Sequence, residues 1–99
     1  MGMPAYTVPC SSRACRQAAQ YKIAARWSDG VTEELKTYAL SCADCLREAF
    51  LLSQDKRARC RLAPGEILET PGIYLLRRGG RDRDLTRESK LEQRILSRN

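Results

Sequence analysis

Hydrophobic and polar residues alternate in the segment YKIAARW, residues 21–27. One face of the repeat carries Tyr21, Ile23, Ala25 and Trp27. A period of two predicts a half-buried β-strand. The Asp29-Gly30 dipeptide that follows is a turn signal, because both residues tolerate positive φ. The next apolar segment, EELKTYALSC at 33–42, predicts the returning strand of a β-hairpin.

The register of this hairpin depends on the length of its loop. A tight two-residue turn would place Ile23 opposite Lys36 and leave the apolar face without partners. A longer or bulged connection places Ile23 opposite Tyr38 and Tyr21 opposite Leu40. We expect the longer connection, because burial of one face strongly specifies register.

A helical period runs from Ser41 to about Ala58. Its apolar face is expected to carry Leu46, Ala49, Phe50 and Ser53. Two Pro-Gly dipeptides then separate two short strands, around EIL and IYLLR. A last short helix is expected over 89–96, where Ser89 and Glu92 have the spacing of a capping box.

The cysteines form two close pairs and one single residue. Cys10 and Cys15 precede the predicted hairpin, Cys42 and Cys45 follow it, and Cys60 stands apart. Two such pairs are typical of zinc sites, since a tetrahedral ion needs four thiolates that converge from different directions. Cys60 is expected to be a small buried hydrophobic residue.

A cysteine-bearing loop, a β-hairpin, and a Cys-x2-Cys that enters a helix together resemble the treble-clef group of zinc folds, over residues 10–57. The resemblance implies that Cys10, Cys15, Cys42 and Cys45 are the ligands of one structural Zn²⁺ per chain. The first pair departs from the usual pattern, because four residues separate its cysteines where two are commonest. A zinc ribbon is a neighbouring possibility, but it would place the second pair in a hairpin turn.

Three other interpretations of the cysteines remain open. A thiol–disulfide redox centre at Cys42 and Cys45 would use the helix N-terminus to lower the thiol pKa, but it would leave the first pair unexplained. An iron or iron–sulfur site could also use four thiolates. A disulfide requires an oxidising compartment, and no secretory signal precedes the first cysteine, so we expect a cytoplasmic protein.

The amino-acid composition shows that the chain is basic. The 99 residues carry a net charge of +6 and include no histidine. The absence of histidine removes the commonest general base, and four thiolates would close the metal shell, so we expect no enzyme activity and no small-molecule substrate. The longest apolar stretches are too short to span a bilayer, so no membrane association is expected.

Basic residues cluster at two places and favour an anionic partner, either nucleic acid or an acidic protein surface. The candidate nucleic-acid contacts are Arg57, Arg59, Arg61, Arg77, Arg78, Arg81 and Arg83. Aspartates alternate with the last of these, so a solvated loop is an equal interpretation of that cluster. The strand GIYLL is a second candidate surface, since on a sheet edge it could accept a partner strand.

These patterns predict one α+β domain over residues 3–99. Residues 10–57 form a zinc-stapled, treble-clef-like half with the order knuckle, β-hairpin and α-helix. Residues 58–99 add a short β element, a basic loop at 77–83 and a C-terminal helix. The function expected from this organisation is that of a non-catalytic interaction module.

Overall fold

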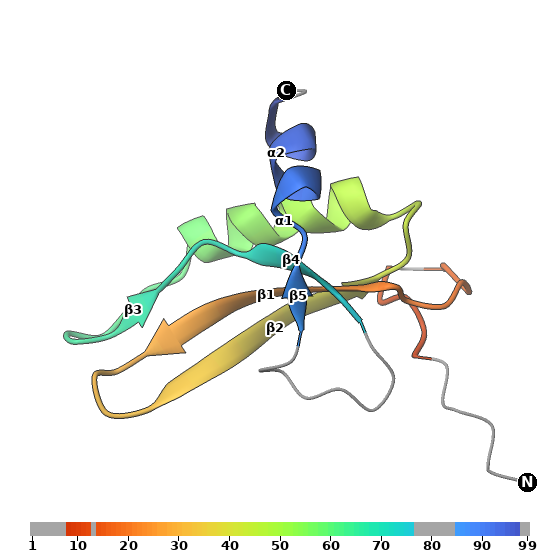
Figure 1. Ribbon diagram of the computed structural model, residues 1–99. Coiled ribbons are helices and arrows are strands. Elements are labelled where there is room, and N and C mark those ends of the chain that lie inside the picture. Colours follow the sequence, from red (N-terminus) through yellow and green to blue (C-terminus); the bar gives the residue numbers. More distant parts are fainter. Residues whose placement is uncertain (1–7, 13, 77–84, 98–99) are drawn as a thin grey trace, which may run out of the picture.

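An antiparallel sheet carries both helices on one face (Figure 1). The computed structural model describes residues 8–12, 14–76 and 85–97. Its strands are β1 (Tyr21–Ser28), β2 (Glu33–Ser41), β3 (Ile67–Leu68), β4 (Gly72–Leu75) and β5 (Thr86–Arg87), and its helices are α1 (Leu46–Ala58) and α2 (Ser89–Ser97). The strands lie in the order β2-β1-β4-β5, and β3 also pairs with β1. The predicted α+β class is confirmed.

The β1–β2 hairpin has the longer connection that the apolar pattern predicts. Residues 29–32 form the loop, and the pairing of Ala24 with Thr37 follows the expected register. A bulge between Ile23 and Ala24 then shifts the pairing, so Ile23 lies opposite Ala39. The predicted pairing of Ile23 with Tyr38 is therefore wrong by one residue, because Tyr38 is the extra residue that the bulge inserts.

Helix α1 begins at Leu46, five residues later than the sequence period predicts. Ser41 instead ends β2, where it is fully buried, and residues 43–45 form a turn. The buried residues of α1 are Leu46, Ala49, Phe50 and Ser53, the four predicted for its apolar face. The helix face was therefore predicted correctly and its start was not, because pairing of Ser41 with Tyr21 extends β2 into the segment predicted as helix.

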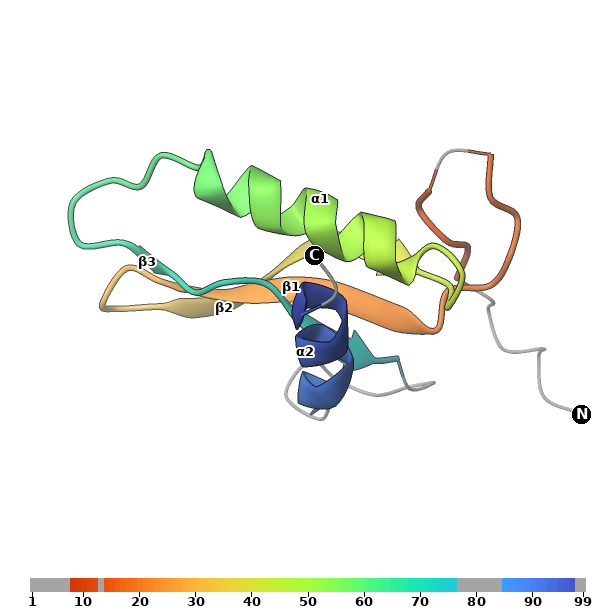
Figure 2. The same cartoon turned by 90° about the horizontal axis from the view of Figure 1, so that it is seen from above.

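The core lies between the sheet and the two helices. Ile23 of β1, Phe50 of α1 and Ile73 of β4 are fully buried, and Ile95 of α2 packs against them. Burial of each such side chain contributes about 1.5–3 kcal/mol. Viewed from above, α1 runs along the hairpin and α2 lies beside β4 (Figure 2).

The second half of the chain extends the same sheet. β3 and β4 pair with successive parts of β1, and the Glu69 N–H donates to the Arg26 carbonyl between them. β4 thus lies inside the sheet, between β1 and β5. The hypothesis that GIYLL forms an exposed edge is wrong, since both of its edges have partners.

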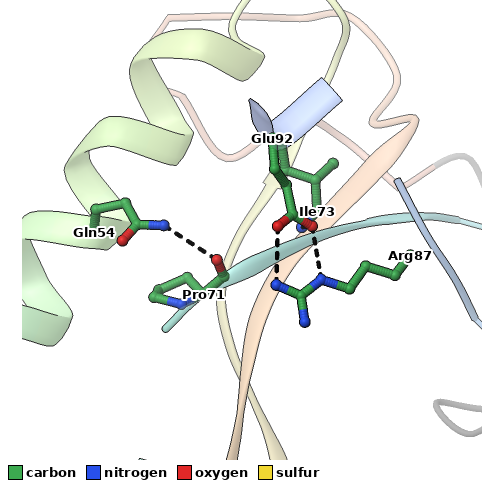
Figure 3. A network of polar contacts seen from close by, with 5 residues as sticks. All are labelled: Gln54, Pro71, Ile73, Arg87 and Glu92. Carbon is green, nitrogen blue, oxygen red and sulfur yellow. Dashed lines mark hydrogen bonds and ion pairs between the residues drawn. The ribbon is translucent and has the colours of Figure 1, made fainter. Parts of the chain in front are cut away.

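Glu92 ties α2 to the sheet (Figure 3). Its carboxylate accepts hydrogen bonds from the Arg87 guanidinium at 2.8 and 2.9 Å and from the Ile73 N–H at 2.9 Å. The sequence predicts Glu92 as the partner of Ser89 in a capping box, but its carboxylate oxygens bond to β4 and β5 instead. Because Arg87 bonds to Glu92 through both carboxylate oxygens, the pKa of its guanidinium rises above the usual value.

Candidate metal centre

Four cysteine side chains converge at one end of the hairpin. The Sγ atoms of Cys10, Cys15, Cys42 and Cys45 all lie within 4.8 Å of one another. The Sγ atoms of Cys15 and Cys42 are 3.8 Å apart. The structure therefore brings together all four residues that the spacing predicts, and this cluster could hold a metal ion.

The first pair lies on a short loop that closes on itself before β1. The Cys10 N–H donates to the Gln17 carbonyl at 2.9 Å, and the Cys15 N–H donates to the Ser12 carbonyl at 3.1 Å. Ala14 has a φ of 65°, in the left-handed region that L-residues seldom adopt. The loop thus brings the thiols of Cys10 and Cys15 into the same cluster.

The loop is fastened to the second pair by polar contacts. Ser11 donates its N–H to the Leu40 carbonyl at 2.7 Å and accepts the Leu40 N–H on its hydroxyl at 3.1 Å. The Gln17 side-chain amide donates to the Asp44 carboxylate at 3.0 Å. These contacts bridge the two cysteine pairs independently of the thiols. Sequence reasoning missed them, since its only signal was the presence of polar residues next to the cysteines.

The second pair lies on the turn that joins β2 to α1. Cys42 follows the last residue of β2, and Cys45 is the N-cap of α1. The Cys45 carbonyl accepts the Ala49 N–H at 3.0 Å, so the start of the helix fixes its backbone. The cysteine cluster thus lies at the point where the loop, the hairpin and the helix meet.

The thiols differ strongly in acidity. Burial opposes ionisation of Cys10, but N–H groups of Cys42 and Ser12, the Ser12 hydroxyl and the Cys15 thiol lower its pKa to about 6. The Ser12 hydroxyl also favours ionisation of Cys45, yet the sulfur atoms of its three neighbours and burial raise its pKa to about 12. The first thiolate forms easily and later ones are opposed by like charge. A cation at the centre would remove this conflict, because metal binding displaces the thiol protons.

The geometry does not favour a redox pair or a disulfide. Thiol–disulfide exchange requires an accessible thiolate, whereas Cys42 is only 1% exposed. All five cysteines are free thiols. The 3.8 Å separation of Cys15 and Cys42 is also far longer than the ~2.05 Å of an S–S bond.

Cys60 lies apart from this cluster, just beyond α1. Its N–H donates to the Arg57 carbonyl at 3.1 Å, and its half-buried thiol donates to the Arg61 carbonyl at 3.8 Å. Burial raises the pKa of the nearby Tyr38 hydroxyl, and Cys60 raises it further. The Tyr38 hydroxyl is buried, and it has no hydrogen-bond partner within the described part of the chain.

The predicted basic contacts divide into three groups. Arg57 donates its guanidinium to the Leu68 carbonyl at 2.7 and 3.2 Å, so it fastens α1 to β3. Arg59 is exposed and pairs with Asp55 at 3.3 Å, and Arg61 is also exposed. The remaining four, Arg77, Arg78, Arg81 and Arg83, lie outside the described residues.

Comparison of the chain with protein-family models, curated proteins and solved structures gave no match. Within residues 8–12, 14–76 and 85–97, no helix has the length and apolarity needed to cross a membrane. The function of the chain is therefore inferred from the site itself.

Proposed function

We propose that this chain is a small, non-catalytic zinc-binding domain whose single Zn²⁺ is structural and bound by Cys10, Cys15, Cys42 and Cys45. The main support for this proposal is the distance between the Sγ atoms of Cys15 and Cys42. Zinc–sulfur bonds of about 2.3 Å in a tetrahedron place neighbouring sulfur atoms about 3.8 Å apart. Cys15 and Cys42 have this separation, at 3.8 Å.

The order of elements supports a treble-clef-like arrangement. A cysteine-bearing loop precedes the β1–β2 hairpin, and the second cysteine pair leads directly into α1. Four thiolates complete a tetrahedral shell, so no position is left for a water or a substrate. A closed shell in a chain without histidine supports a structural role rather than catalysis.

Zinc would add stability at the end of the hairpin where the four cysteines meet. The core cluster includes none of the four cysteines, although Cys10 and Cys42 are themselves buried. Structural zinc contributes roughly 10–16 kcal/mol in small zinc fingers. That is comparable with the ~5–15 kcal/mol net stability of a whole domain.

Metal substitution tests the site. Titration of metal-free protein with Co²⁺ under reducing conditions should give the visible absorption of a tetrahedral thiolate complex, and Zn²⁺ should displace the cobalt. Cys15→Ser should weaken the absorption, whereas Cys60→Ser should leave it unchanged. An octahedral cobalt spectrum, or iron in the purified protein, would contradict a four-thiolate zinc site.

The partner of the domain is proposed to be anionic, either nucleic acid or an acidic protein surface. The net charge of +6 and the exposure of Arg59 and Arg61 support this. Binding of single-stranded and duplex nucleic acid should be measured over a range of salt concentrations. A nucleic-acid partner is supported if the affinity falls steeply as the salt concentration rises. The affinity should also fall in Arg59→Glu and Arg61→Glu, and it should not fall in Arg94→Glu on α2. Absence of nucleic-acid binding supports the acidic protein surface.

A further inference from the structure

The outer edge of β2 is available for strand pairing. β2 is the last strand on its side of the sheet. Among the described residues, only Ser11 bonds to this outer edge, and it does so at Leu40. An edge of this kind presents a row of backbone N–H and C=O groups to any strand that approaches it.

The backbone groups of Leu35 point outward along this edge. Leu35 lies opposite Arg26 of β1, and the Arg26 carbonyl accepts the Glu69 N–H on the other side of β1. Arg26 and Leu35 therefore form a pair without mutual hydrogen bonds, because inward and outward groups alternate along an antiparallel ladder. By the same alternation, Glu33 and Thr37 also direct their N–H and C=O groups outward.

The side chains around Leu35 are complementary to themselves. If two copies of β2 pair antiparallel about Leu35, Glu34 of each copy lies opposite Lys36 of the other. Pairing about Glu33, Glu34 or Lys36 would instead place identical charges opposite each other. Only the Leu35-centred pairing joins opposite charges, and it does so twice across the dyad.

We propose that β2 pairs with β2 of a second copy of this chain, antiparallel and centred on Leu35, to form a symmetric dimer with one continuous sheet. The two Leu35 residues would exchange both N–H···O bonds, and Glu33 would do the same with Thr37 of the other copy. The ladder ends at Tyr38, where the bulge and the Ser11 contact interrupt the edge. The charges of Glu34 and Lys36 disfavour the other registers and favour the register centred on Leu35. The dimer extends the proposed function and does not depend on which metal is bound.

Sedimentation of the full metal-loaded chain in a dilution series tests the proposal. The unmodified protein should be a dimer that dissociates on dilution. Lys36→Glu and Glu34→Lys each create like-charge pairs at the dyad, and each should raise the dimer dissociation constant about tenfold or more. The double variant restores opposite charges and should restore the dimer. Lys90→Glu on α2 makes the same charge change as Lys36→Glu and should have no effect.

A mixing experiment separates loss of pairing from loss of folding. A chain that carries Glu34→Lys has two lysines beside Leu35, and a chain that carries Lys36→Glu has two glutamates there. In a mixed dimer each of these lysines lies opposite a glutamate of the other chain. The two single variants should therefore be monomers separately and dimers when they are mixed. A monomeric unmodified protein, or mixed variants that fail to associate, would overturn the proposal.

Discussion

The Sγ atoms of Cys15 and Cys42 lie 3.8 Å apart, although the two residues are 27 positions apart in the sequence. The β1–β2 hairpin accounts for this approach, because it returns the chain to the loop that precedes β1. The Ser11–Leu40 and Gln17–Asp44 contacts then hold that loop against the end of β2. The cysteine cluster is thus the convergence point of three segments.

Loss of one buried ligand should remove both the metal and the local fold. Cys42→Ser is expected to abolish stoichiometric zinc binding and to remove a large part of the roughly 10–16 kcal/mol that structural zinc can provide. Zinc content and the denaturant midpoint of unfolding measure the two effects. Cys60→Ser is the matched control, because this thiol lies outside the cluster, and it should retain the zinc. Full zinc content in Cys42→Ser would exclude Cys42 as a ligand.

Removal of the Glu92 carboxylate should destabilise the docking of α2. Glu92→Ala leaves the Ile73 N–H without its acceptor and Arg87 without its partner. We expect a loss of about 2–3 kcal/mol in the free energy of unfolding, since hydrogen bonds to charged groups contribute ~1.5–3 kcal/mol. Glu92→Gln retains an acceptor and should lose less.

Arg87→Ala provides the comparison for Glu92→Ala in the same denaturation experiment. The Arg87 side chain is 41% exposed, so water solvates part of its charge. Its removal should cost clearly less than removal of Glu92, because the Ile73 N–H keeps its acceptor. Equal losses in the two variants would show that the ion pair, rather than the Ile73 hydrogen bond, carries the stability.

The hairpin loop should give stability a dependence on acid pH. N–H groups of Thr32 and Val31 donate to the Asp29 carboxylate and lower its pKa below the usual value. A group whose folded-state pKa is lowered stabilises the fold above its unfolded pKa, and this contribution is lost as pH falls through the folded pKa. The difference in denaturant midpoint between the unmodified chain and Asp29→Asn should therefore shrink from about pH 6 to about pH 3. The comparison is made at pH values at which both proteins are folded without denaturant, and a difference that stays constant as the pH falls through this range would contradict this role of Asp29.

The sequence predicts those features that depend on spacing and periodicity. Alternation in residues 21–27 identifies β1, the Leu46–Ser53 period identifies the buried face of α1, and the two cysteine pairs identify the cluster. Each of these patterns depends on the spacing of residues along the chain, so it can be recognised without knowledge of tertiary contacts.

Features that depend on tertiary contacts are not predictable in this way. The bulge at Tyr38 and the end of β2 at Ser41 depend on how β2 pairs with β1. Glu92 has the spacing of a capping residue, but the approach of α2 to β4 gives its carboxylate a different set of donors. Likewise, the place of β4 inside the sheet depends on β5, whose two residues carry no strand signal of their own.

The most direct test of the four-thiolate site is native against denaturing mass spectrometry of protein purified without added metal. We expect a native mass with one zinc per chain. On denaturation the zinc should be lost, and all five cysteines should remain free thiols. A metal-free native mass that lacks two hydrogens would contradict the four-thiolate site, because it would show a disulfide in place of the metal.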